Sequence, residues 1–209
     1  LSGTIPLLIS KLHRLTNLGL GYNHLTRNLP TTLFYLSLLE QLDLQSNNLI
    51  GTIPSAIGYL QNLKSCYLQR NRFSGTLPSS LGYLTNIQVL MVNDCLLSGT
   101  IPTIIGRLTN LMILYLNGNQ LSGNIPSSFG YLTNAMAFYM SENQFTGTLP
   151  SSIGLCTNLN IVFLTVNRLT GTIPSTYHNL SYLYIFDAAG NSLTGSLPSW
   201  FWEISALPY

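Results

Sequence analysis

Few residues of this 209-residue chain have side chains that could catalyse a reaction. Asp94 and Glu142 are the carboxylate pair to consider, because two carboxyl groups that share a proton can divide the roles of acid and base. They occupy equivalent positions in two units of a 24-residue repeat described below, with one unit between them. Neighbouring units stack at about 4.8 Å, so the two carboxylates lie about 10 Å apart, which is too far to share a proton. His13, His24 and His178 occupy unrelated positions in distant parts of the chain. The sequence therefore predicts no catalytic activity and no cofactor.

The cysteines indicate neither a metal site nor a disulfide framework. Cys66, Cys95 and Cys156 are odd in number, and no CxxC motif is present. All three fall at positions that the repeat pattern buries, so we expect inert free thiols. Asn179-Leu180-Ser181 is the one glycosylation sequon, and it makes Asn179 a candidate glycosylation site.

The elements that would position any functional residue follow from a repeat. Nine prolines recur at intervals of 24 residues: Pro6, Pro30, Pro54, Pro78, Pro102, Pro126, Pro150, Pro174 and Pro198. A fixed period of this length predicts a solenoid, in which each unit is too small to enclose a core and stacked units share one.

Each unit divides into two local patterns. Leucines spaced three apart, as in Leu36 and Leu39, suit a 3₁₀ turn, and the Leu-x-Leu pair that follows has the period of a strand with both leucines on one side. We expect short strands at 18–20, 42–44 and 63–68 and at the equivalent positions of the other units.

The repeat resembles the plant-type leucine-rich repeat, whose pattern is LxxLxxLxLxxNxLxGxIPxxLGx. Leu36, Leu42, Leu44, Asn47 and Gly51 show the match in one unit. The resemblance implies a right-handed solenoid with a concave parallel β-sheet, second short strands, and 3₁₀ or irregular turns on the convex side. It covers one domain over residues 1–209, with a partial repeat at 1–11, eight full repeats at 12–203 and the start of a ninth at 204–209. We expect this chain to be part of a longer protein.

One recurring polar position has a structural interpretation. Its side chains can satisfy buried backbone groups where each strand turns. The residues at this position are Asn47, Asn71, Cys95, Asn119, Asn143, Asn167 and Asn191.

A column on the concave face is the main candidate binding site. Residues between the paired leucines point away from the core, and five consecutive units place Tyr67, Met91, Tyr115, Tyr139 and Phe163 there. Exposed aromatic residues within a polar rim favour ligand binding, although strand propensity alone is an alternative explanation. The remaining candidates are Asp43 and Asp187 at the ends of the column and Arg70, Arg72, Asn93, Asn117, Glu142 and Arg168 at the rim.

A second outward face carries hydroxyl groups and gives the alternative hypothesis. Its members resemble the threonine arrays of ice-binding solenoids, although solvated strands rich in Ser and Thr are the simpler interpretation. These candidate surface-binding residues are Thr52, Thr76, Thr100, Thr146, Thr148, Thr170 and Thr172.

Composition limits the classes of partner. Only 7% of residues are charged and the net charge is +2, so no basic cluster is present to neutralise nucleic-acid phosphates. No apolar run approaches the roughly 18 residues that span a bilayer. The family resemblance implies a receptor-like or secreted recognition protein, outside the cell or at its surface, with a protein, peptide or glycan ligand. An ice- or surface-binding solenoid remains the alternative.

Overall fold

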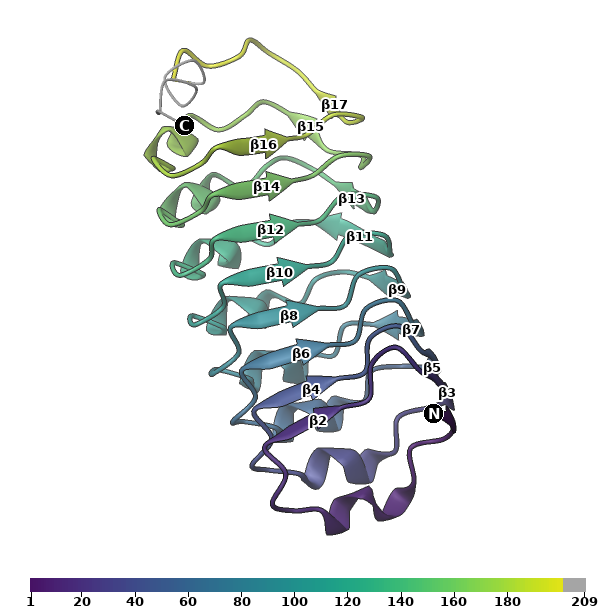
Figure 1. Ribbon diagram of the computed structural model, residues 1–209. Coiled ribbons are helices and arrows are strands. Elements are labelled where there is room, and N and C mark those ends of the chain that lie inside the picture. Colours follow the sequence, from purple (N-terminus) through teal and green to yellow (C-terminus); the bar gives the residue numbers. More distant parts are fainter. Residues whose placement is uncertain (201–209) are drawn as a thin grey trace.

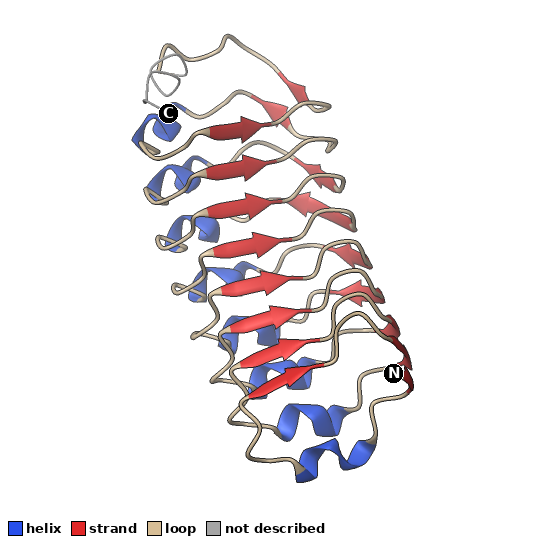
Figure 2. Cartoon of the chain, viewed as in Figure 1, coloured by secondary structure: helices blue, strands red, loops and turns tan. Residues whose placement is uncertain are grey.

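The computed structural model describes residues 1–200 as a solenoid of stacked coils (Figures 1 and 2). Each coil contains one strand of a long sheet, one strand on a second side and one short 3₁₀ helix. The chain stacks its coils in sequence order, so residues 24 apart lie side by side. The predicted end of the eighth repeat at 203 and the start of the ninth at 204–209 lie outside the described residues.

The concave sheet is parallel and contains eight strands, each paired with the strands of the coils before and after it. The strands are β2 (Asn17–Gly19), β4 (Gln41–Asp43), β6 (Ser65–Tyr67), β8 (Val89–Met91), β10 (Ile113–Tyr115), β12 (Ala137–Tyr139), β14 (Ile161–Phe163) and β16 (Ile185–Asp187). The first two begin and end one residue earlier than predicted, and β6 is shorter than the predicted 63–68. The difference arises because Leu63 is already in the turn before the strand and Leu68 is in the loop after it.

The second side of the solenoid also consists of parallel strands. Seven form one sheet: β1 (Ser2–Gly3), β3 (His24–Arg27), β5 (Asn48–Gly51), β7 (Arg72–Thr76), β9 (Leu96–Gly99), β11 (Gln120–Asn124) and β13 (Gln144–Thr146). The last two, β15 (Thr170–Gly171) and β17 (Ser192–Leu193), pair with each other. A single bridge between Thr148 and Thr170 continues the sheet towards them.

A 3₁₀ helix follows each of the first eight recurring prolines. Proline suits this place because its ring fixes φ near −65° and its missing N–H is not needed at a helix start; Pro54, for example, has φ −65°. The helices are η1 (Leu7–Lys11), η2 (Thr31–Tyr35), η3 (Ser55–Tyr59), η4 (Ser79–Tyr83), η5 (Thr103–Arg107), η6 (Ser127–Tyr131), η7 (Ser151–Leu155) and η8 (Ser175–Asn179).

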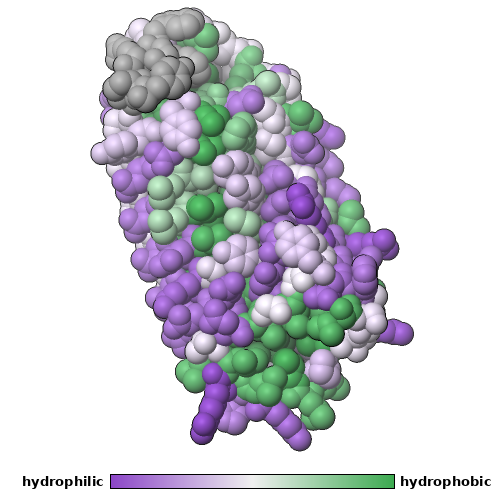
Figure 3. All heavy atoms as spheres, viewed as in Figure 1, coloured by the Kyte–Doolittle hydropathy of each residue, from purple (hydrophilic) through white to green (hydrophobic). Residues whose placement is uncertain are grey.

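One continuous apolar core runs through the coils, with the paired leucines such as Leu42 and Leu44 fully buried. The three cysteines are free and buried, as predicted. At the N-terminal end Leu7, Leu8 and Leu12 remain more than half exposed, and Figure 3 shows this apolar area in green.

The recurring asparagines join neighbouring coils by hydrogen bonds. Asn119 is typical: its Oδ1 accepts from the Leu97 N–H at 3.0 Å, and its Nδ2 donates to the carbonyls of Val92 and Leu116, both at 3.0 Å. Asn47, Asn71, Asn143, Asn167 and Asn191 form the same set of bonds. The side chains thus bond the backbone groups that the turn after each strand would otherwise leave unpaired.

Candidate ligand-binding surface

The predicted concave column is aligned coil by coil. We call Tyr67, Met91, Tyr115, Tyr139 and Phe163 the concave stripe. Each pairs in register with the next across the parallel sheet, and Asp43 and Asp187 continue the row at its two ends. All five side chains are partly buried, because each is packed between its neighbours.

The aromatic rings of the stripe are ordered by stacking. The rings of Tyr115 and Tyr139 have centroids 4.0 Å apart and planes 8° from parallel. The rings of Tyr139 and Phe163 have centroids 5.4 Å apart at 22°. Burial, followed by the hydrogen bond and proximity of Tyr139, raises the pKa of Tyr115 to about 12. Tyr115 is therefore uncharged at physiological pH, and the stacked rings present an ordered apolar surface.

The N-terminal end of the stripe has a defined acidic group. The Asp43 carboxylate accepts hydrogen bonds from the backbone N–H and the Nε2 of Gln45, both at 3.1 Å. Gln45 in turn accepts from the Nε2 of Gln69 at 2.9 Å. At the C-terminal end the Asp187 carboxylate accepts from the Ala189 N–H at 3.1 Å.

A polar column lies directly beside the stripe, two residues further along each coil. It consists of Gln69, Asn93, Asn117 and Ser141. The side-chain oxygens of all four are buried, and none has a hydrogen-bond partner within residues 1–200. A buried oxygen without a donor costs about 1–3 kcal/mol. Four such oxygens lie in consecutive coils, each shielded from the surface of the concave face.

Asn93 differs from the exposed rim position that we predicted. It is only 9% exposed. Its Nδ2 donates to Asp94 at 2.8 Å, which leaves its Oδ1 as the unpaired atom. Asn117 lies in the same column and is partly buried.

The charged rim candidates are exposed, and two of them have an unusual backbone. Arg70 and Glu142 have φ of 54° and 55°, in the left-handed region that most residues avoid. Arg70 Nε lies 3.7 Å from Asp94 Oδ2, and both side chains are exposed, so this pair contributes little to stability. Arg72 and Arg168 are also exposed but are not paired with a carboxylate within the described residues.

The threonine face lies on the other side of the coil. Thr52, Thr76, Thr100, Thr148 and Thr172 are exposed at the ends of the second strands or just after them, whereas Thr146 is partly buried. Thr170 is exposed, and its hydroxyl donates to the Gly147 carbonyl at 3.3 Å. The methyl groups of the first set sit over glycines of the next coil: a Cβ at Gly75 would lie 2.8 Å from Thr52 Cγ2. This contact orients the threonines of successive coils alike.

Asn179 is exposed at the end of η8, so the side chain of the sequon is accessible to solvent. Within residues 1–200, no three His, Cys, Asp or Glu side chains come together in a group that could hold a metal ion. The same residues include no helix with the length and hydropathy to cross a membrane.

Sequence comparison identifies the family. The family model for the leucine-rich repeat matches residues 38–60, 62–84, 110–132 and 179–204. This chain is a leucine-rich repeat protein of the plant type. No curated protein sequence matches it significantly.

Solved structures of leucine-rich repeat ectodomains resemble the whole solenoid. One is the ectodomain of the plant membrane receptor kinase GASSHO1/SCHENGEN3 from Arabidopsis thaliana in complex with CASPARIAN STRIP INTEGRITY FACTOR 2. It is 37% identical with a TM-score of 0.95, and the match covers 96% of this chain and 24% of that one. Another is the plant peptide hormone receptor RGFR1 in complex with RGF2, at 36% identity and a TM-score of 0.94, covering 96% of this chain and 32% of that one. This leucine-rich repeat chain thus spans about a quarter to a third of their length.

A third structure is that of a plant ice-binding protein. It is 27% identical to this leucine-rich repeat chain with a TM-score of 0.85, and the match covers 95% of this chain and 64% of that one. The same solenoid architecture thus occurs in proteins whose ligands differ in kind, so the fold alone does not determine the ligand.

Proposed function

We propose that this leucine-rich repeat chain is a non-catalytic recognition module that binds a peptide, protein or glycan ligand on the concave stripe. The observation that carries the proposal is the row of apolar side chains that the repeat aligns on the concave face, with the rings of Tyr115, Tyr139 and Phe163 stacked. This row is not needed to close the core, which lies on the other side of the strands. We place the module outside the cell or at its surface, as in the receptor ectodomains that it resembles.

Of the three ligand classes, the stripe favours a peptide. An extended peptide supplies apolar side chains that can pack on the stacked rings, while its polar backbone faces the polar and charged rim. Two solved relatives support the same class. One is the plant peptide hormone receptor RGFR1 in complex with RGF2, and the other is the Arabidopsis receptor kinase HAESA in complex with the peptide hormone IDA and the co-receptor SERK1.

The stacked tyrosines should carry most of the affinity. Tyr115 and Tyr139 are already ordered by their contact, so a ligand that covers them loses little side-chain entropy. Tyrosines at the centre of an interface are typical hot spots. Asp43 and Asp187 would then select basic groups at the two ends of the ligand.

The test uses peptides selected on the protein itself. A displayed library of short random peptides is panned on the wild-type chain, and the affinities of the selected peptides are measured for Tyr115→Ala, Tyr139→Ala and Tyr59→Ala. We expect the first two changes to weaken binding by about 2 kcal/mol. Tyr59 is a matched control, since it is 63% exposed on the convex side. Peptides that bind all variants equally, or that lose affinity only for Tyr59→Ala, would refute the proposal.

The threonine face supports a second candidate function, adsorption to ice or another regular surface. Its basis is the uniform orientation of Thr52, Thr76, Thr100, Thr148 and Thr172 by the glycines beneath their methyl groups, together with the ice-binding relative. Ice-shaping by the wild-type chain that is lost in Thr148→Ala with Thr172→Ala, and retained in Tyr139→Ala, would support this function. An absence of ice-shaping by the wild-type chain would exclude it.

A further inference from the structure

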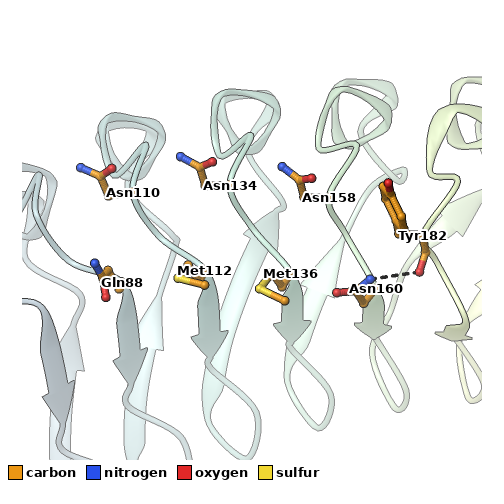
Figure 4. A pocket seen from close by; sticks show the side chains of 8 residues that line it. All are labelled: Gln88, Asn110, Met112, Asn134, Met136, Asn158, Asn160 and Tyr182. Atoms are coloured by element: carbon orange, nitrogen blue, oxygen red, sulfur yellow. Dashed lines mark hydrogen bonds between the residues drawn. The ribbon is translucent and has the colours of Figure 1, made fainter.

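A groove unrelated to the concave stripe runs along the solenoid where each chain segment turns into a strand of the concave sheet. It has a volume of about 460 Å³ and crosses the coils from Gln88 to Tyr182. Figure 4 shows its two walls as two rows of side chains, one of asparagines in the turn and one at the residues immediately before the strands. The volume lies within the range of sites that bind small organic ligands.

The asparagine wall is rigid and repeats once per coil. Asn110, Asn134 and Asn158 each donate an Nδ2 hydrogen bond, at 2.8–2.9 Å, to a backbone carbonyl of the preceding coil. The donated bond fixes the orientation of each amide, and Figure 4 shows the three oxygens directed the same way. A ligand therefore meets a regular series of exposed acceptors at about the 4.8 Å spacing of neighbouring strands.

The opposite wall is apolar at its centre. Met112 and Met136 are 37% and 39% exposed although methionine is usually buried, and they lie between Gln88 and Asn160 in the same row. Tyr182, 62% exposed, stands at the C-terminal end of the groove, and its carbonyl accepts from Asn160 Nδ2 at 3.1 Å. The ring adds a flat apolar surface whose edge is polar.

The groove contains no charged side chain among its lining residues. The methionine wall belongs to a column with one residue in each coil. The charged members of this column, Glu40 and Lys64, lie in earlier coils and form an ion pair, with Lys64 Nζ 2.8 Å from Glu40 Oε2. The neutral segment thus begins at Gln88, where the groove begins. Electrostatic complementarity favours a ligand without net charge.

From these features we infer that the groove binds a neutral, linear, β-1,4-linked oligosaccharide. Successive sugars of such a chain are turned by about 180°, but hydroxyl groups lie on both edges of each ring, so every unit offers a hydroxyl donor to one asparagine oxygen. Its C–H face packs on Met112, Met136 or the ring of Tyr182. The chain advances by nearly the coil spacing per sugar unit, so successive sugars stay beside successive coils. Four or five coils would hold about as many sugar units.

An extended peptide fits this groove less well. In an extended peptide every second side chain points the same way, so the side chains on one face are about 6.6 Å apart. This spacing does not match coils that are about 4.8 Å apart. Such a peptide also supplies one N–H donor per residue, where a sugar unit supplies several hydroxyls. A proline-rich peptide, whose threefold repeat spans about two coils, is the competitor to include in the test.

The experiment uses the methionine methyl groups as local probes. The chain has four methionines, Met91, Met112, Met136 and Met140. In a sample labelled with ¹³C at these methyls, cellohexaose or mannohexaose is titrated and the NMR shifts are followed. We expect Met112 and Met136 to shift in a saturable manner, while Met91 on the concave stripe and the buried Met140 do not. A shift of Met91 alone would place the saccharide on the stripe and overturn the inference without affecting the proposed function.

Two variants and a matched control complete the test. We expect Tyr182→Ala, and the double change Met112→Ala with Met136→Ala, each to weaken binding of the hexasaccharide at least tenfold. Tyr59→Ala removes a tyrosine of nearly equal exposure, 63%, from another face and should leave binding unchanged. Tyr182 and Tyr59 are mostly exposed, so their removal should leave the melting temperature close to that of the wild type. Met112 and Met136 are more than half covered, so the double variant is compared at a temperature where circular dichroism shows that it is folded.

Three results would refute the inference. The first is a wild-type chain that binds neither hexasaccharide. The second is equal binding of maltohexaose, whose α-1,4 linkage gives a coiled chain, or of charged hexagalacturonate. The third is a proline-rich peptide that shifts Met112 and Met136 at lower concentration than the saccharides. Because Tyr115→Ala and Tyr139→Ala affect only the stripe, failure here is distinguishable from failure of the proposed concave site.

Discussion

Tyr115 and Tyr139 lie face to face on adjacent strands, with ring centroids 4.0 Å apart and planes 8° from parallel. The stack is a direct result of the 24-residue repeat, which places both residues at one register of a parallel sheet. Each ring limits the movement of the other before any ligand arrives. The concave stripe is therefore preorganised at the place where we propose that a ligand binds.

Burial of Tyr115, together with its contact with Tyr139, makes the stability of the chain fall at alkaline pH. The pKa of Tyr115 is raised to about 12 in the folded chain, against about 10 in the unfolded chain, so the folded state holds the phenol proton more tightly. Its contribution to stability is complete below pH 10 and is lost as the pH rises towards 12. We expect Tyr115→Phe to lessen the fall in urea midpoint between pH 9.5 and 11. An unchanged pH dependence in the variant would contradict the raised pKa.

Cys95 is the weak member of the asparagine series. Its Sγ is 3.8 Å from the Leu68 carbonyl, where the amide of Asn71 is 2.9 Å from the Leu44 carbonyl. Sulfur is a weak hydrogen-bonding atom, so we expect Cys95→Asn to stabilise the chain by about 1 kcal/mol. Urea unfolding measures the change. Cys66→Asn is the control and should destabilise strongly, because Cys66 faces the apolar core; stabilisation by both changes would disprove the explanation.

Val166 is held in a conformation that suits it poorly. It has φ 55° and is 59% exposed, and β-branched residues are rare in the left-handed region. Asparagine tolerates this conformation, so Val166→Asn should stabilise by about 1 kcal/mol. Ile50→Asn makes a similar change at an exposed position of β5, where the backbone is extended, and should be neutral or unfavourable. Differential scanning calorimetry of both variants measures the change in stability. A lower melting temperature for Val166→Asn, or a higher one for Ile50→Asn, would contradict the explanation.

The thiols should react slowly in the folded chain. Burial raises the pKa of Cys66 to about 12 and that of Cys156 to about 11, and it also raises the pKa of Cys95, where the N–H groups of Asn71 and Phe73 oppose the effect. The thiolate is the reactive form, so iodoacetamide at pH 8 should label all three slowly and label the denatured chain fast. Mass spectrometry distinguishes the sites. Rapid native labelling of Cys66 would contradict its place in the core.

The repeat made the concave stripe predictable from the sequence. Period 2 within a strand and period 24 between strands determine both the face and the neighbours of Tyr115, and neither depends on detailed packing. The same reasoning located the asparagine series and the buried cysteines. The left-handed backbone at Arg70 and Glu142 was not predicted, although Gly118 and Gly190 at equivalent positions were a signal that could have indicated it.

Burial across coils was harder to predict. Asn93 is only 9% exposed although the pattern places it beside the stripe, because burial depends on how far each side chain reaches, which the period of the repeat does not determine. The neutral groove was missed for a related reason. Met112 and Met136 lie one residue before the strands, and only the hydrogen bonds of Asn110, Asn134 and Asn158 to preceding coils define the opposite wall.

The asparagine bonds have a consequence for how the length of such a protein can change. Each connects residues 22 or 27 apart when it crosses between coils, as Asn119 does with Leu97 and Val92. Removing one whole unit, such as 84–107, would leave every remaining coil with a neighbour that offers the same partners, and would bring Tyr67 beside Tyr115. The molecule is thus modular. A 24-residue deletion or duplication changes the length of the concave surface that a ligand can contact, while it preserves the hydrogen bonds between neighbouring coils.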